Sequence, residues 1–338
     1  RMALCPDRGN ALLAYRPQGL TGGAAIEALR LKGTLGGSAM TLSADAARGS
    51  LATRTFDLRN ALLLLGDPAA PVRLNATTLA GKMDAKGLSG TMAGTSGRIG
   101  TIPLLVGDAA GKWSYAASTL RVDGALTLTD AAAPNRFEPL VSRDFALTLR
   151  NSQITAKGSL LEPKTGALVA RTDIVHQLGS GKGQADLDVP GVAFTSALQP
   201  EMLTRLALGV VANARGTVAG KGQIRWTGDT VTSDGTFHTD NMDLAAAFGP
   251  VTGLSGELRF TDLIGLVSAP SQIARIKTVN PGVEVTDGVV RYQLLANQQV
   301  RVESGEWPFA GGQLSLLPTT MDFSADKPRN LAFRVVGL

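Results

Sequence analysis

The stretch LSGELRFTDL, Leu254 to Leu263, has the pattern of one β-strand with two different faces. Successive side chains of a strand point to opposite sides, so the apolar Leu254, Leu258 and Phe260 fall on one face and polar residues on the other. Such a strand needs a cover for its apolar face. The same alternation recurs along most of the 338 residues, while helical patterns are few.

Composition indicates a folded, mainly β protein. Hydrophobic residues make up 44% of the chain and charged residues 18%, and the 40 glycines stand beside Asn, Asp, Ser and Pro at intervals typical of short strands joined by turns. Cys5 is the only cysteine, which excludes an internal disulfide. The formal charge of +5 comes from scattered basic residues, so the chain lacks the basic stripe of a nucleic-acid-binding protein.

Roughly twenty segments have the length and alternation of strands. Turn-like connections at Glu162–Gly166, Ala296–Gln299 and Asp326–Asn330 predict that neighbouring strands are mostly antiparallel. The apolar positions of the clearest strands are predicted to share one face. They are Val122, Leu126, Leu128, Phe145, Leu147, Leu149, Leu187, Val189, Ile224, Trp226, Leu254, Leu258, Phe260, Leu331 and Phe333.

One segment has a helical pattern. Residues 200–215 begin with Pro and Glu, place apolar residues at three-and-four spacing from Leu203 to Val211, and end before Gly216. We predict an amphipathic helix there, lying on the sheet as a lid or inside it as a gate. Gly23–Leu29 and Leu244–Phe248 are weaker helix candidates.

So many strands cannot form one flat sheet. An open, twisted sheet rarely exceeds about ten strands, and twenty strands spaced about 4.8 Å apart would extend on the order of 100 Å. The sheet must therefore curl. Two arrangements fit: two sheets that bury their apolar faces against each other, as in a sandwich or barrel, or one long sheet folded lengthwise into an open trough with an apolar inner wall.

The polar residues do not form a recognisable active site. His176 and His238 lack the spacing of metal ligands, and we interpret them as surface or hydrogen-bonded residues. Two acidic pairs could be imagined as the carboxylates of a glycosidase, but a solvated strand face and a helix N-cap explain them better. These pairs are Asp186 with Asp188 and Asp240 with Asp243. No catalytic residue, metal site or cofactor is predicted.

A resemblance to a known family enters with the second half of the chain. The ordered segments LQPEMLTRLALGVVANARGTVAGKGQIRWTGD (Leu198–Asp229), LAAAFGPVTGLSGELRFTDLIGLVSAP (Leu244–Pro270) and VRVESGEWPFAGGQLSLLPTTMDFS (Val300–Ser324) resemble the C-terminal region of YdbH-type proteins. These belong to the AsmA-like superfamily, together with TamB and YhdP. We therefore divide the chain into 1–197, an N-terminal part of the same β-structure, and 198–338, the YdbH-type region.

The resemblance implies a bridge-like lipid transfer protein. Members form a long β-groove, a β-taco, that crosses the periplasm, moves phospholipids between the inner and outer membranes and supports outer-membrane lipid homeostasis. It further implies an N-terminal inner-membrane anchor and a small outer-membrane lipoprotein as partner. We expect the anchor to lie outside this chain, and the sequence to continue past Leu338, which falls within a strand-like pattern.

The alternative is an extracellular β-rich binding module, or a β-helix acting on polysaccharide. A β-helix has a fixed period of about 20 to 25 residues, whereas this chain repeats only loosely. Carbohydrate sites usually present exposed aromatic residues, and the chain has three Trp and three Tyr. Both observations favour the lipid groove.

Overall fold

The computed structural model describes residues 3–4, 8–16, 19–100, 102, 104–208, 210–228, 230–246, 249–280, 282–324 and 330–337, with side chains from residue 22 onward. Nearly all of the described chain is β-structure. The strands are β1 (Ala3–Leu4), β2 (Arg8–Arg16), β3 (Gly19–Leu35), β4 (Ser38–Ser50), β5 (Thr55–Leu65), β6 (Val72–Asp84), β7 (Gly87–Ile99), β8 (Leu104–Ala116), β9 (Thr119–Asp130), β10 (Leu140–Arg150), β11 (Gln153–Leu161), β12 (Leu168–Gln177), β13 (Lys182–Phe194), β14 (Val211–Thr227), β15 (Thr230–Ala246), β16 (Gly249–Asp262), β17 (Val267–Ser268), β18 (Gln272–Val279), β19 (Val285–Leu295), β20 (Gln299–Phe309), β21 (Gly312–Leu316), β22 (Thr319–Asp322) and β23 (Phe333–Val336).

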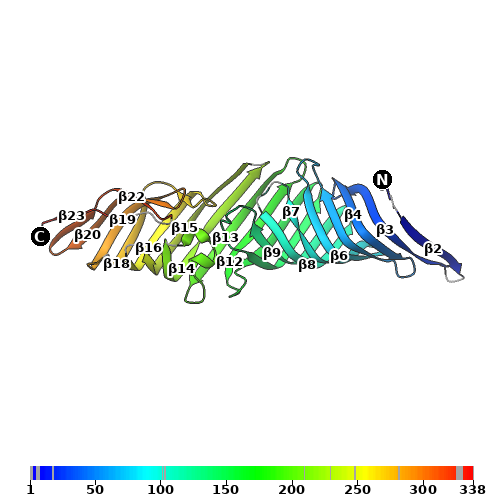
Figure 1. The fold of residues 1–338 in the computed structure, drawn as a ribbon, viewed down its shortest axis with the longest axis horizontal. Coiled ribbons are helices and arrows are strands. Elements are labelled where there is room, and N and C mark those ends of the chain that lie inside the picture. Colours follow the sequence, from blue (N-terminus) through cyan, green and yellow to red (C-terminus); the bar gives the residue numbers. More distant parts are fainter. Residues whose placement is uncertain are drawn as a thin grey trace.

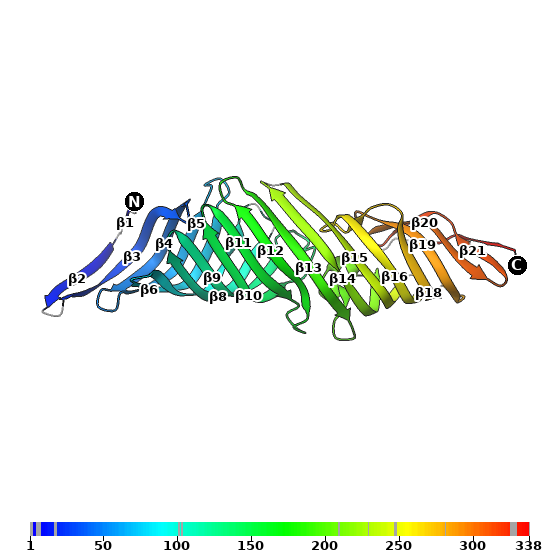
Figure 2. The ribbon, with the colours of Figure 1, turned by 180° about the vertical axis from the view of Figure 1, so that it is seen from behind.

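These strands form one sheet of 23 strands, and their pairings are antiparallel. From β3 to β16, each strand pairs with the strands before and after it in the chain. The two ends of the chain consequently lie at opposite ends of an elongated molecule (Figures 1 and 2). The prediction of a long, antiparallel, all-β sheet is confirmed.

Short turns explain why neighbours in sequence pair. At the β8–β9, β10–β11 and β19–β20 connections, two consecutive residues adopt left-handed φ angles, the geometry that matches the twist of the flanking strands. They are Ala117–Ser118, Asn151–Ser152 and Asn297–Gln298. The last of these confirms the predicted turn at Ala296–Gln299.

The β11–β12 turn is also where the sequence placed it, at Glu162–Gly166. The buried Glu162 carboxylate accepts hydrogen bonds from the Lys164 amide at 3.0 Å and from the amide and hydroxyl of Thr165, both at 2.6 Å. The third predicted turn, Asp326–Asn330, lies outside the described residues except for Asn330.

The predicted helix at 200–215 is wrong. Two short 3-10 turns, Pro200–Met202 and Arg205–Ala207, occupy the start of this segment, and β14 begins at Val211. The Thr204 side chain interrupts any helix, since it accepts the Leu206 amide at 3.2 Å and donates to the Arg136 carbonyl at 2.5 Å. The weaker helix candidates are wrong too: Gly23–Leu29 lies in β3, and 244–246 ends β15.

The sheet curls about its long axis, which gives it a concave and a convex face. Side chains of β4, β5 and β6 pack against side chains of β10 and β11, strands several places away in the sheet order. A flat sheet would keep them far apart. The four buried clusters lie on this concave face, and the largest includes Val251, Val302, Trp307 and Leu316 at the C-terminal end.

The two long rims of the curled sheet touch at separate points, which we call the seam, but no strand pairing among the described residues joins the rims, so the sheet stays a curled open groove and not a barrel. Because consecutive strands are antiparallel, connections alternate between the rims. The β3–β4 turn on one rim meets the β10–β11 turn on the other, where the Ser152 amide donates to the Gly36 carbonyl at 2.6 Å. Farther along, Gly66 lies against Leu178, and Ile102 packs with Trp226. The sheet is therefore wound so that the connections on one rim contact strands that come several places later in the sheet order.

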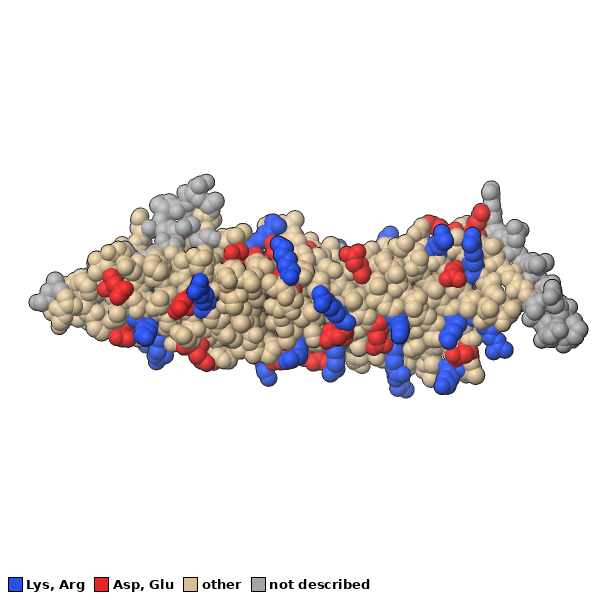
Figure 3. All heavy atoms as spheres, turned by 90° about the horizontal axis from the view of Figure 1, so that it is seen from below, with Lys and Arg blue, Asp and Glu red and all other residues tan. Residues whose placement is uncertain are grey.

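The convex face is polar. Lysine, arginine and acidic residues are interspersed along the molecule in the view of Figure 3, without a continuous stripe of one sign. Several are paired across neighbouring strands, such as Lys157 with Asp173 at 2.8 Å and Arg225 with Asp234 at 2.6 Å. Exposed pairs of this kind stabilise a protein only slightly.

Candidate functional site

The register of the sheet places the predicted apolar residues of β9 and β10 on one face. Directly paired residues of neighbouring strands point to the same side. Leu147 is paired with Val122, and Phe145 with Gly124. Leu149 belongs to the buried cluster on the concave face, so Leu147 and Phe145 also point inward. Leu126 and Leu128 follow Val122 at even spacing on β9.

The same face continues over β13 to β16. Trp226 packs in a concave-face cluster with Ala185, and Ile224 packs against it. Leu187 and Val189 follow Ala185 at even spacing. On β16, Leu258 is paired with Phe237, Phe260 with Gly235 and Leu254 with Met242.

The predicted residues differ in how much surface they leave uncovered. Leu149, Trp226 and Phe260 are only 1%, 6% and 8% exposed, because protein covers them. Phe333, on the outermost strand β23, is 44% exposed. The others are half-buried: Val122, Leu126, Leu128, Phe145, Leu147, Leu187, Val189, Ile224, Leu254, Leu258 and Leu331. Apolar surface therefore remains accessible along the concave face.

His176 lies on the concave face beside Trp226. The Trp226 indole nitrogen donates to Nδ1 of His176 at 3.1 Å, and the two rings are 6.0 Å apart at a tilt of 34°. Burial lowers the pKa of His176, and a hydrogen bond to the Lys182 backbone opposes this only in part. The imidazole is thus neutral, and it accepts the hydrogen bond from the indole N–H, as expected for a hydrogen-bonded histidine in the core. His238 is exposed on β15.

The acidic pair of Asp186 and Asp188 lies within β13, on the face opposite the buried Ala185. Asp186 accepts hydrogen bonds from Gln184 and Gln223, and Asp188 lies 3.7 Å from Arg171. These contacts fit the solvated strand face that the sequence predicted.

The N-cap role predicted for the second pair, Asp240 and Asp243, is wrong. Asp240 and Asp243 lie within β15, which continues to Ala246 without a helix start. Asp243 accepts the backbone amide of Gly253 at 2.9 Å, a contact between neighbouring strands.

Sequence reasoning missed a buried ion pair, Asp130 with Arg136. The Asp130 side chain is fully covered and accepts two hydrogen bonds from the Arg136 guanidinium, at 2.7 and 2.8 Å. Burial raises the pKa of Asp130, but the hydrogen bonds from Arg136 outweigh that effect and lower it. The pair holds the β9–β10 connection, whose backbone also binds Leu203 and Thr204. Its only signal in the sequence was a connection rich in Ala, Pro and Asn.

Sequence reasoning also missed aromatic residues of the concave face. Phe56 and Trp113 lie over Gly81, with ring centres 6.1 Å apart. Phe237 lies against Gly235 and meets Phe260 edge-on at 5.8 Å. The available signal was the presence of glycine and aromatic residues on neighbouring strands. To recognise it, one must know which residues of the two strands lie opposite each other, and the sequence alone does not give that register.

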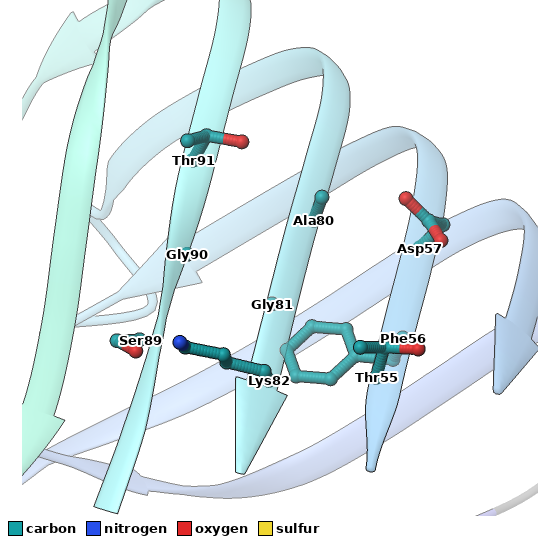
Figure 4. A pocket seen from close by; sticks show the side chains of 9 residues that line it. All are labelled: Thr55, Phe56, Asp57, Ala80, Gly81, Lys82, Ser89, Gly90 and Thr91. Atoms are coloured by element: carbon teal, nitrogen blue, oxygen red, sulfur yellow. The ribbon is translucent and has the colours of Figure 1, made fainter. Parts of the chain in front are cut away.

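Two shallow hollows lie behind these glycines, on the convex side. One, of about 350 Å³, is bordered by Thr55, Asp57 and Lys82 and by the glycines themselves, while the Phe56 ring extends toward Gly81 (Figure 4). The other, of about 660 Å³, lies over Gly222 and Gly235 and is lined by charged side chains. Their polar borders do not suit an apolar ligand.

The described part of the chain contains no cluster of three or more His, Cys, Asp or Glu residues that could hold a metal ion. In the same residues, no helix reaches the length and apolarity that crossing a bilayer requires. Nothing in the described geometry assembles a nucleophile, a general base and an oxyanion site.

Comparison with known proteins gives one match. Neither the curated proteins nor the solved structures searched contain a match to this chain. A family model, YdbH-like, described as intermembrane phospholipid transport protein YdbH, matches residues 3–338, which includes both segments into which we divided the chain. The match covers almost the whole sequence and agrees with the resemblance noted in the C-terminal half. The chain belongs to the YdbH-like family.

Proposed function

We propose that the concave face carries the acyl chains of phospholipids, and that this chain forms part of a bridge across the periplasm between the inner and outer membranes. In this proposal an inner-membrane anchor and a small outer-membrane lipoprotein complete the bridge, and the flow of lipid supports outer-membrane homeostasis. The observation that carries the proposal is the family match over residues 3–338, together with the half-buried apolar residues that follow the concave face from β9 to β16.

The energetics explain why such a face is useful. A phospholipid that crosses water exposes two acyl chains, roughly 30 methylenes, and at about 0.8 kcal/mol each the free-energy penalty is on the order of 25 kcal/mol. A curled apolar sheet covers the chains and leaves the headgroup in water. Because similar strands repeat along the axis, no single position needs to bind a chain tightly enough to stop it.

In the part of the chain that the structure describes, no set of polar residues converges on one point, which is compatible with this role. An enzyme needs a fixed constellation of reactive groups, whereas a conduit needs a uniform apolar surface. His176 is hydrogen-bonded to Trp226, and Asp130 is paired with Arg136, so neither is free to act on a substrate.

A charge on the concave face tests the proposal. Leu258 is half-buried on β16, so Leu258→Glu would place a carboxylate on the path of the acyl chains while leaving room for the side chain to reach solvent. We expect the variant to fold and to lose most of the phospholipid that co-purifies with the wild-type chain, because an unpaired charge in an apolar surface is strongly unfavourable. Mass spectrometry of lipids extracted from detergent-free preparations measures the loss.

The matched control is Thr261→Glu, which adds the same charge to an exposed position of the same strand. Its lipid content should equal that of the wild type. Lipid-free wild-type protein in repeated preparations, or a Leu258→Glu variant that is folded and still loaded, would contradict the proposal.

A further inference from the structure

Several aromatic side chains of the concave face occupy the space that a β-carbon would take on a neighbouring glycine. We define two such places. The N-terminal aromatic site consists of Phe56, Trp113, Gly81 and Gly90; the C-terminal aromatic site consists of Phe237, Phe260, Gly220, Gly222 and Gly235. In each, two glycines of adjacent strands are directly paired, Gly81 with Gly90 and Gly222 with Gly235.

At the N-terminal aromatic site, two rings share the space above one glycine. A methyl carbon added to Gly81 would fall on the Phe56 ring and lie 2.8 Å from Cζ2 of Trp113. The Trp113 indole nitrogen lies within 3.2 Å of the Ala80 carbonyl and 3.3 Å of the Thr91 carbonyl, on the strands that carry Gly81 and Gly90. The indole is therefore held against the wall by hydrogen bonds to the wall itself.

The C-terminal aromatic site repeats the arrangement. A methyl carbon on Gly235 would lie 2.9 Å from Cε2 of Phe237, and one on Gly220 would lie 2.7 Å from its Cδ1. The Phe260 ring meets Phe237 edge-on, at an angle of 73°. Phe237 thus lies over a glycine-lined part of the wall, as Phe56 does near the other end.

Exposure separates these rings from others that also cover glycines. Trp226 covers Gly183 and Trp307 covers Gly288 and Gly305, but these indoles are 6% and 5% exposed inside buried clusters. Phe56, Trp113 and Phe237 are only half-buried. Their rings therefore form part of the accessible concave surface.

We propose that the two aromatic sites set the width of the acyl path, because Gly81 at one site, and Gly220 and Gly235 at the other, let a large ring lie within the wall instead of projecting into the concave space. This inference rests on the proposed function, and it assigns selectivity for the thickness of the acyl chain to these residues. A straight alkyl chain can move past such a ring, whereas a chain with a bulky substituent collides with it.

A purely structural role is the competing explanation, since a cross-strand aromatic ring also stabilises a strand that contains glycine. The two explanations differ for a double variant. If the ring only stabilises the strands, the single and double variants should differ in stability, while the thickness of the acyl chain that they accept stays the same. If the ring limits the width, removing it should reverse the effect of the added methyl group.

The experiment measures which lipids the purified chain takes up from vesicles. The vesicles contain equal amounts of dioleoyl phosphatidylcholine and a phosphatidylcholine with one pyrene-labelled acyl chain, and mass spectrometry gives the ratio of pyrene-labelled to unlabelled lipid bound. We expect Gly81→Ala to lower this ratio about tenfold, the effect of small steric changes in an apolar site. Phe56→Ala should raise it, and the double variant should restore it toward the wild-type value.

Gly107→Ala is the matched control, because Gly107 also lies within a strand and a methyl carbon there would lie 4.0 Å from its nearest neighbour, Thr127. Its ratio should not change. Gly235→Ala and Phe237→Ala repeat the comparison at the C-terminal aromatic site.

A double variant with the same low ratio as Gly81→Ala would overturn the inference, and so would a ratio that none of the variants changes while the wild type binds both lipids. If Gly81→Ala does not fold, Phe56→Ala alone still tests the inference. An unchanged ratio of pyrene-labelled to unlabelled lipid in this variant would show that the Phe56 ring does not limit the width of the path. A wild-type chain that binds neither lipid would overturn the proposed function itself.

Discussion

At the scale of the residue, His176 couples the stability of the fold to pH. Its neutral ring accepts the Trp226 indole hydrogen under a cover that includes Ile102 across the seam. Protonation would replace this acceptor with a second donor and leave a charge in a buried site. The hydrogen bond is therefore compatible only with the neutral imidazole.

The sign of the resulting pH dependence follows from the lowered pKa of His176. Below the ordinary histidine value of about 6.5, the unfolded chain binds a proton that the folded chain does not, so the free energy of unfolding should fall as the pH drops from about 7 to 5. This single group can contribute at most about 1.4 kcal/mol per pH unit. Urea unfolding followed by tryptophan fluorescence at both pH values measures the change.

The variant His176→Gln removes the titration and keeps an acceptor for the indole, so its stability should vary less over this range. The control, His238→Gln, changes an exposed histidine and should keep the wild-type slope. The carboxyl groups with lowered pKa, such as Asp130 and Glu162, lose their contribution mainly below pH 5, because their ordinary pKa values are 3.8 and 4.5, and they act equally in the wild type and in His176→Gln. Equal slopes for wild type and His176→Gln would contradict the prediction.

At the scale of the element, the connection from β13 to β14 shows where the sequence pattern misleads. The apolar spacing from Leu203 to Val211 matches a helix, but Val211 and Ala212 pair with the end of β15. A helix there would remove these ladder hydrogen bonds, so the demands of the sheet override the local pattern. A single sequence contains no direct information on which strand needs a partner.

Gln199 is expected to stabilise this connection through hydrogen bonds from its side chain to the backbone. Its amide nitrogen donates to the Thr195 and Ala214 carbonyls, at 2.5 and 3.0 Å, and its oxygen accepts the Ala214 amide at 2.9 Å. Ala214 is completely buried. Gln199→Ala should therefore lower the free energy of unfolding by about 1–3 kcal/mol, because it leaves buried backbone groups without partners.

Urea denaturation measures this loss, with Gln313→Ala as the control. Gln313 is an exposed residue of β21, and surface substitutions of this kind usually change stability by less than about 0.5 kcal/mol. Similar effects for the two variants would show that the connection does not depend on Gln199.

At the scale of the whole molecule, alternation predicted the strands well and the curl only in general terms. The apolar positions of β9 and β10 were identified from their spacing alone, since a period of two is a local property of the chain. The shift of register between Ser142 and Phe145, and the contact of Gly36 with Leu149, are not local. They depend on how far the sheet turns, which no single strand encodes.

The same contact distinguishes a wound sheet from an open ribbon. Leu149 is 1% exposed because it packs with Leu65 and Val72 of the opposite rim and with Leu178. Leu147, two residues earlier on the same face, is half-buried. If the seam holds the two rims together, Leu149 should contribute much more to the free energy of unfolding than Leu147.

We therefore expect Leu149→Ala to lower the free energy of unfolding by about 2–5 kcal/mol, the range for cavities in well-packed cores, and Leu147→Ala to lower it by clearly less. Chemical denaturation of both variants gives the difference. Hydrogen exchange of the Ser152 amide, in the β10–β11 turn, should increase in Leu149→Ala alone, because this amide donates to the Gly36 carbonyl at the point that Leu149 covers. Equal losses in the two variants, without faster exchange at the turn, would mean that the rims meet without stabilising each other. The groove would then be free to widen along its whole length, instead of being held at the points of the seam by apolar side chains.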